Sequence, residues 1–180
     1  MKTLTLLRHA KSSWEGRSVA SDFERPISKR GQRAARTMGR ELRARGLAFD
    51  RVIASPATRV VETIEGFEEG FGGPLRPSFD ERVYLASPAT LLGIVRETED
   101  GAERLLIVGH NPGLEALAML LTRDNGGLRE EMAAKYPTAT VAEIRLPVDH
   151  WRDAEIGTGE LTEFIRPRDL DPALGPEENS

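Results

Sequence analysis

Two histidines and two arginines are the residues of this chain whose types and positions indicate chemistry. Arg8 and His9 follow one short apolar segment, Arg59 lies just after a second, and His110 follows a third. Guanidinium groups bind phosphate oxygens in pairs, and a neutral imidazole is a competent nucleophile near pH 7. Together, the four side chains would make a phosphate-binding site that carries its own nucleophile. Taken singly, each is explained better as an ordinary polar loop or surface residue, and it is their joint placement that favours a site.

These side chains need a scaffold that brings the ends of the apolar segments together. Short apolar runs alternate along the chain with segments of helical period, which predicts an α/β fold: a three-layer α/β/α sandwich with a mostly parallel central sheet. The first and fourth runs are apolar on both faces, as in buried parallel strands, so we expect them at the sheet centre. The predicted strands cover residues 3–7, 51–54, 75–79, 104–108, 138–146 and 160–166.

Helix signals follow several of these strands. We interpret Ser55-Pro56 and Asn111-Pro112 as N-caps followed by a proline at the first helical position, and Ser28 as the N-cap of a helix that stops near Gly46. A further helix is predicted over residues 88–99. In doubly wound sheets, ligands bind beyond the carboxyl ends of the strands, where helix N-termini present free N–H groups. The four residues are therefore expected to meet in one pocket.

Length and composition limit the remaining possibilities. The chain has 180 residues, of which 39% are hydrophobic and 30% charged, and this indicates one globular domain. We expect that domain over residues 1–166, followed by a tail at 167–180 that packs little core. The net charge of −4 argues against a general nucleic-acid or anionic-membrane binder. Any bound anion must therefore meet a local positive site.

The absence of cysteine removes several kinds of chemistry. Without cysteine the chain has no disulfide, no Cys-ligated metal and no thiol nucleophile. No His and Asp cluster has metal-ligand spacing, so we expect neither a metal nor another cofactor. The apolar run at residues 4–7 is too short for a signal peptide, and no stretch approaches the ~20 apolar residues of a membrane span. A cytoplasmic protein is the expectation.

Four motifs resemble those of a known family. Residues 7–14 (LRHAKSSW) are similar to the opening signature of the histidine phosphatase superfamily, branch 1, whose members are phosphoglycerate mutase-like. Ala10 replaces the usual glycine, as in SixA-like phosphohistidine phosphatases. Residues 55–59 (SPATR) resemble the family's second arginine motif and 108–112 (VGHNP) its second histidine motif. Residues 22–31 (DFERPISKRG) are similar to the segment that leads into the first helix of SixA-like members.

The resemblance implies a mechanism. His9 would be the nucleophile and form a phosphohistidine that water hydrolyses, while Arg8, Arg59 and His110 would bind the phosphoryl group and stabilise its transition state without a metal. Glu81 stands where many relatives carry an acidic proton donor. A carboxyl that donates at neutral pH needs a raised pKa, so a solvated loop carboxylate is an equal interpretation of Glu81.

Departures from the family pattern bear on the substrate. Glu15 follows Trp14 at a place where sugar-phosphate relatives carry an asparagine, and the chain lacks the long insertions with which phosphoglycerate mutases enclose their substrate. An open site of this kind favours a phosphohistidine-bearing signalling protein as substrate. A small phosphate ester, turned over by the same mechanism, and a non-catalytic phospho-ligand binder are the alternatives. His150 has no motif around it and is expected to be structural or exposed.

Overall fold

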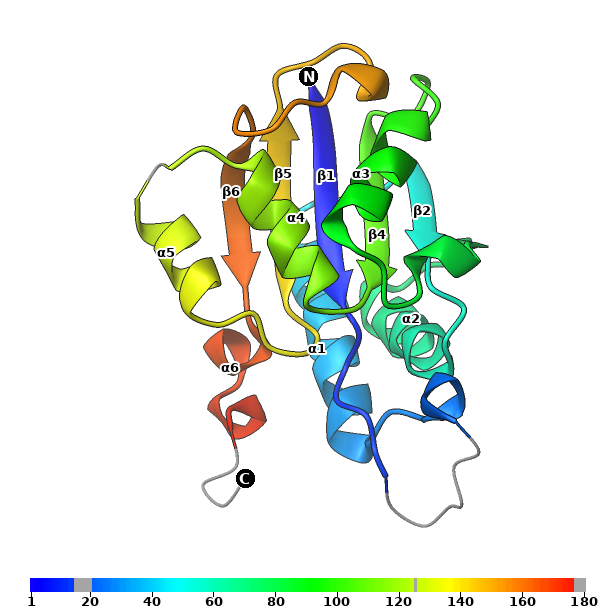
Figure 1. Ribbon diagram of the computed structural model, residues 1–180. Helices are drawn as coiled ribbons and strands as arrows, with labels where there is room; N and C mark the ends of the chain where they lie inside the picture. Colours follow the sequence, from blue (N-terminus) through cyan, green and yellow to red (C-terminus); the bar gives the residue numbers. More distant parts are fainter. Residues whose placement is uncertain (15–20, 125, 177–180) are drawn as a thin grey trace.

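The computed structural model describes residues 1–14, 21–124 and 126–176, which form a six-stranded sheet between helices (Figure 1). The sheet order is β3-β2-β4-β1-β5-β6. Strands β1 to β4 pair in parallel, whereas β5 is antiparallel to both of its neighbours, β1 and β6. The α/β class with a mostly parallel sheet is thus confirmed. The strands are β1 (Lys2–Arg8), β2 (Arg51–Ala54), β3 (Ser78–Phe79), β4 (Arg104–Gly109), β5 (Val141–Leu146) and β6 (Glu160–Ile165).

The two most apolar strands, β1 and β4, lie side by side at the centre of the sheet, as predicted. Their register pairs Leu4 with Leu105 and Arg8 with Gly109. Because both strands run in the same direction and end at the same level, the residues that follow them, His9 and His110, emerge next to each other. The pairing of two hydrophobic strands therefore determines the position of both histidines.

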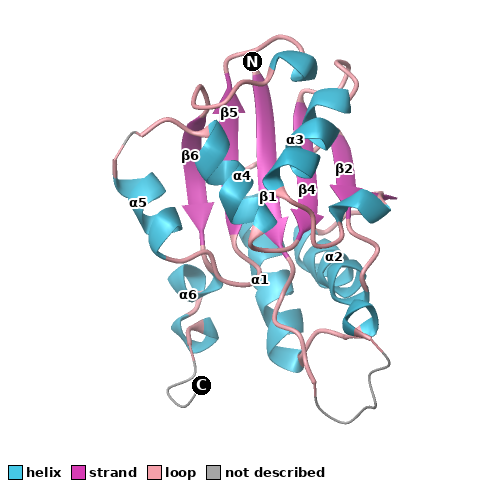
Figure 2. Cartoon of the chain, in the orientation of Figure 1, coloured by secondary structure: helices cyan, strands magenta, loops and turns pink. Residues whose placement is uncertain are grey.

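Helices cover both faces of this sheet (Figure 2). On one face lie α1 (Lys29–Ala44) and α2 (Thr58–Phe71), and on the other lie α3 (Pro88–Glu97), α4 (Gly113–Leu121) and α5 (Gly127–Ala134). Alternation along β4 serves both layers: Leu105 and Ile107 belong to the core under α3 and α4, whereas Leu106 and Val108 belong to the core under α1 and α2. A short helix, α6 (Pro167–Leu170), follows β6.

Helices α1 and α2 approach each other unusually closely. A Cβ atom at Gly39 would lie 2.1 Å from the carbonyl oxygen of Phe67, and one at Gly70 would lie 2.0 Å from that of Arg36. Only glycine permits this backbone contact, which joins the middle of α1 to the last turns of α2.

Two helix starts differ from the sequence prediction. The N-cap of α2 is Ala57 and that of α4 is Pro112, so the interpretation of Ser55 and Asn111 as N-caps was wrong. The Ser55 hydroxyl instead accepts a hydrogen bond from the Ala57 N–H and contacts His110, and the peptide bond between Asn111 and Pro112 is cis. The polar side chains after β2 and β4 are thus used by the loops that lead into the helices. Ser28 does cap α1, because its hydroxyl accepts from the Gly31 N–H.

Two predicted strands are longer than the observed ones, because the pattern of apolar residues does not show which residues pair with a neighbouring strand. The predicted strand at 75–79 pairs only over Ser78–Phe79, and the one at 138–146 begins at Val141. Helices α5 and α6 were not predicted. Residues 167–176 lie against α1, where Asp171 pairs with Arg33 and Leu174 packs on the cluster that contains Ala34. The domain boundary at residue 166 stays a prediction.

Candidate active site

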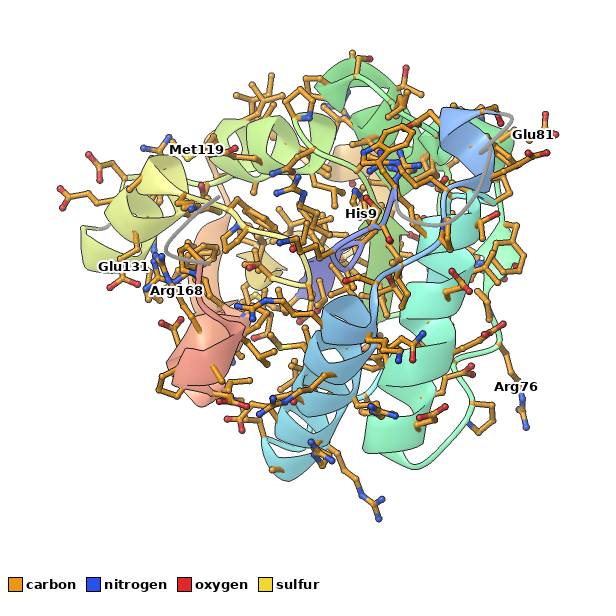
Figure 3. The ribbon with its side chains drawn as sticks, turned by 90° about the horizontal axis from the view of Figure 1, so that it is seen from below. His9, Arg76, Glu81, Met119, Glu131 and Arg168 are labelled. Carbon is orange, nitrogen blue, oxygen red and sulfur yellow. The ribbon has the colours of Figure 1, made fainter. Side chains whose placement is uncertain are left out.

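The two motif histidines meet at the carboxyl end of the central strands. The His9 N–H donates to the carbonyl oxygen of Gly109 at 3.0 Å, and the His9 and His110 ring centroids are 5.4 Å apart. Both residues are buried, with 8% and 3% of their surface exposed. In the view along the strands, His9 lies in the middle of the molecule where β1 ends (Figure 3). The structure therefore brings together His9, His110 and, as described below, Arg59.

The hydrogen bond of the His9 ring defines its tautomer. Nδ1 lies 2.8 Å from the carbonyl oxygen of Ala10, which can only accept, so Nδ1 carries the hydrogen and Nε2 keeps its lone pair. Burial, helped by the positive charges of Arg8 and Arg59, lowers the pKa of His9 to about 4. At pH 7 the ring is neutral, and its Nε2 has the electronic state that a nucleophile needs.

Thr63 fixes the backbone of this turn. Its hydroxyl accepts a hydrogen bond from the Ala10 N–H at 2.8 Å and donates to the carbonyl oxygen of Arg59 at 2.6 Å. Thr63 is completely buried, so the bridge is shielded from water. The nucleophile-bearing loop is thereby attached to the first turn of α2, from which Arg59 extends.

His110 is held in the opposite tautomer. The Arg59 guanidinium, which can only donate, lies 3.2 Å from Nδ1, so Nδ1 accepts and Nε2–H donates to the Ser55 hydroxyl at 2.8 Å. Burial, followed by the nearby Arg59 and His9, lowers the pKa of His110 to about 3. His110 is thus a neutral ring with a defined orientation at pH 7.

Asp22 gathers the donors on the Arg59 side of the site. Arg59 donates to its backbone oxygen at 2.7 Å and to its carboxylate at 3.0 Å, while Arg25 and the Tyr84 hydroxyl donate to the same carboxylate at 2.7 Å each. The Tyr84 hydrogen bond, followed by those from Arg25 and Arg59, holds the pKa of Asp22 well below its usual range. An ionised carboxylate therefore lies among donors that suit a phosphoryl group.

Sequence reasoning assigned no role to Asp22, Arg25 or Tyr84. Asp22 and Arg25 lie in the segment at 22–31 that carried part of the family resemblance, so a signal was present. The contact of Asp22 with Arg59 spans 37 positions of the chain, which is why local spacing did not reveal it. Tyr84 also contacts the His110 ring edge-on, with centroids 5.3 Å apart.

Arg8 lies beside the histidine pair but turns toward a different neighbour. Its guanidinium donates to the carbonyl oxygen of Tyr136 at 2.9 Å, and its buried Nε has no partner among the described residues. Burial lowers the pKa of Arg8 from its ordinary value. The Nε of Arg59 is likewise buried, and it too has no hydrogen-bond partner among the described residues. Two guanidinium groups next to His9 thus retain hydrogen-bonding capacity.

Glu81 is not brought to the His9 ring. It is an exposed residue at the start of a single 3₁₀ turn, Glu81–Val83, and Figure 3 shows it at the periphery, far to the side of His9. Its role as proton donor stays a prediction. Trp14 is 63% exposed and lies under the Arg25 guanidinium, 4.3 Å from the ring centroid. Glu15 lies outside the described residues.

The described residues also bear on the expectations about metals and membranes. Across 1–14, 21–124 and 126–176, no three His, Asp or Glu side chains gather closely enough to hold a metal ion. Over those same ranges, no helix has both the length and the apolar composition of a membrane span.

Comparison with known proteins supports the class that this geometry indicates. The model of the histidine phosphatase superfamily (branch 1) matches residues 4–84. The uncharacterized protein Rv1276c of Mycobacterium tuberculosis (strain ATCC 25618 / H37Rv) is 36% identical over 165 residues, which cover 90% of this chain and 100% of the relative. The chain belongs to the histidine phosphatase superfamily, branch 1.

Solved structures agree with this assignment. A protein from Nakamurella multipartitia, assigned as the phosphohistidine phosphatase SixA, superposes with a TM-score of 0.78 at 28% identity, covering 92% of this chain and 96% of the other. The protein histidine phosphatase SixA complexed with tungstate superposes with a TM-score of 0.76 at 19% identity, covering 94% and 99%. The fold is therefore phosphoglycerate mutase-like.

Proposed function

We propose that this protein is a metal-independent phosphatase that works through a covalent phosphohistidine on His9. The observation that carries the proposal is the hydrogen bond from Nδ1 to the Ala10 carbonyl, which leaves Nε2 unprotonated. In the first step Nε2 bonds to phosphorus as the bond to the leaving group breaks, and the leaving group takes up a proton. In the second step water attacks phosphorus, the N–P bond breaks, and phosphate and neutral His9 are released.

The cations around His9 suit the charge that develops on the phosphoryl oxygens. Arg59 and Arg8 each have a buried Nε that is unpartnered within the described residues. His110 is a neutral ring whose Nε2–H already donates to Ser55, so it reaches a phosphoryl oxygen only by giving up that hydrogen bond. Donors that are already positioned stabilise a transition state without a reorganisation cost. Since the Asp22 carboxylate uses the Arg59 Nη2 donor, an arriving phosphoryl group competes with it for that donor.

The preferred substrate is a phosphohistidine carried by a protein. An alkyl phosphate ester needs a proton donor for its alkoxide, yet in this site Asp22 is ionised, His110 is neutral and Glu81 lies away from His9. An imidazole leaving group is protonated readily by solvent and needs little such help. The similarity to SixA structures and the exposed Trp14 beside Arg25 support an open site for a protein substrate.

Turnover of matched substrates by the purified protein tests this function. We expect a phosphohistidine-bearing phosphotransfer protein to be hydrolysed on the order of 10²-fold faster, in kcat/KM, than phosphoserine peptides or alkyl phosphate esters, because the last two lack acid assistance. His9→Ala should abolish both activities. Preferential hydrolysis of alkyl esters would support the small-ester alternative, and binding without turnover would support the non-catalytic one.

A further inference from the structure

A second hollow, which we call the cationic cleft, adjoins the His9 site on the side of α6. Its volume is about 300 Å³. Five cationic residues line it, contributed by β1, the loop after β1, α1, the segment before β5, and α6: Arg8, Lys11, Arg30, Lys135 and Arg168. None of the lining residues is acidic. The cleft is thus a concentration of positive charge in a chain whose net charge is −4.

In the part of the chain that the structure describes, three of the cleft cations are not paired with a carboxylate, although Glu115 acts on Arg8 and Asp169 acts on Arg168 at longer range. Within the described residues, Arg30, Lys135 and Arg168 form no ion pair, and Arg30 donates instead to the carbonyl oxygen of Gly175. Neighbouring arginines outside the cleft behave differently: Arg33 pairs with Asp171, and Arg166 pairs with Asp169. Like charges around one small hollow repel one another, and a bound anion would relieve that repulsion.

Arg8 connects the cleft to the reaction centre. It is adjacent to His9 in the chain and lines the cleft, and its guanidinium donates to Tyr136, which lies between the cleft residues Lys135 and Pro137. Figure 3 shows Arg168 on the α6 side of the molecule, well to the side of His9. The cleft therefore leads outward from the phosphoryl site, and an anion that reaches Arg168 belongs to an elongated substrate.

We propose that the cationic cleft binds acidic side chains that flank the phosphorylated histidine of a protein substrate. This inference rests on the proposed function and adds a specificity site to it. The walls of the cleft also include Ala34, Pro137 and Leu174, which suit the methylene groups of a glutamate, and the volume accommodates one or two such side chains. Acidic flanks would hold the substrate with its phosphohistidine facing His9.

The test uses two phosphohistidine peptides that differ only in their flanks, with glutamates in one and glutamines in the other. Wild-type protein should hydrolyse the glutamate peptide roughly tenfold better in kcat/KM, an advantage that shrinks as salt rises. The double variant Lys135→Gln/Arg168→Gln, which leaves the proposed catalytic residues intact, should lose this advantage and retain its rate on the glutamine peptide. The matched control Arg40→Gln/Arg152→Gln removes the same charge from exposed positions outside the cleft and should keep the advantage.

The outcomes separate this inference from the proposed function. Equal wild-type rates on both peptides, or an advantage that survives in the double variant, would overturn the cleft proposal while turnover itself supports the phosphatase. A small substrate with a second phosphate could also be hydrolysed with a higher kcat/KM than the glutamate peptide. That result would overturn the cleft proposal and assign the cleft to small molecules. If neither peptide is hydrolysed, the proposed function fails. The affinities of the two unphosphorylated peptides, measured by fluorescence anisotropy, then test the cleft: tighter binding of the glutamate peptide that is lost in the double variant supports it, and equal binding overturns it.

Discussion

The two ends of the central sheet use the same residue type in opposite ways. At the carboxyl end, His9 and His110 are buried beside arginines, and both are neutral at pH 7. At the other end, the His150 side chain is 46% exposed and contacts the Asp100 carboxylate at 2.9 Å, which also accepts from the Trp151 N–H. A histidine beside cations, out of water, is suited to chemistry, whereas one beside a solvated carboxylate is suited to joining two loops. Burial and the sign of the neighbouring charge make the difference.

Removing the nucleophile should give the largest effect. We expect His9→Ala to lower kcat by about 10⁴-fold or more, because no other group replaces the covalent route. His150→Ala should leave kcat within about twofold, since its half-exposed side chain contacts Asp100 at the far end of the sheet from His9. Steady-state kinetics on a phosphohistidine substrate measures both. A large loss in the His150 variant would remove the contrast between the two ends.

Arg59 should rank second. Arg59→Ala removes the guanidinium that contacts His110 and Asp22, so we expect kcat/KM to fall by about 10²- to 10³-fold, with weaker capture of phosphate. Competitive inhibition by inorganic phosphate measures the capture directly. Arg36→Ala, at a mostly exposed pair with Glu69, is the control and should behave as wild type. Unchanged inhibition in the Arg59 variant would contradict its assigned role.

The lowered pKa values make the carboxyl end sensitive to acid. Between pH 6.5 and about 4 an unfolded His9 binds a proton that the folded state does not, so the free energy of unfolding falls as pH falls through this window. For His9 the loss amounts to about 3 kcal/mol, at about 1.4 kcal/mol per pKa unit. Urea unfolding at pH 7 and pH 4 measures it. His9→Gln should show a smaller loss, and an identical loss would mean that His9 is not buried in its neutral form.

Replacing Asp22 should have a smaller effect, and it should strengthen phosphate binding rather than weaken it. Asp22→Asn removes the negative charge that competes for Arg59, so inorganic phosphate should bind roughly three- to tenfold more tightly. Tyr84→Phe deletes one hydrogen bond to the same carboxylate without changing the charge, and should alter phosphate binding less. Isothermal titration with phosphate distinguishes the variants. Weaker binding by the Asn variant would show that Asp22 positions Arg59 rather than competing for it.

Glu81 should give the smallest effect. A general acid at this position would make Glu81→Gln slow ester hydrolysis by about 10²- to 10⁴-fold. The exposed position at the periphery instead predicts a change below about threefold. Ester hydrolysis as a function of pH measures the effect, and a large loss restricted to esters would restore Glu81 as their proton donor.

Much of the scaffold was predictable because apolar pattern determines it. The runs at 4–7 and 105–108 are apolar on both faces, which predicted two central strands, and the ends of these strands bring His9 and His110 together. The roles of Ser55 and Asp22 were not predictable, because each depends on a side-chain contact with a residue from another element. The cationic cleft escaped prediction for the same reason, since its residues are spread from Arg8 to Arg168 and no local motif marks them.

The most direct test of the account is to trap the covalent intermediate. Wild-type protein mixed with a labelled phosphohistidine substrate and quenched within milliseconds should carry one phosphate that is stable in alkali and lost in acid, and mass spectrometry should locate it on His9. His9→Ala should carry none. A phosphate found on another residue, or turnover at the wild-type rate in the His9 variant, would contradict the mechanism.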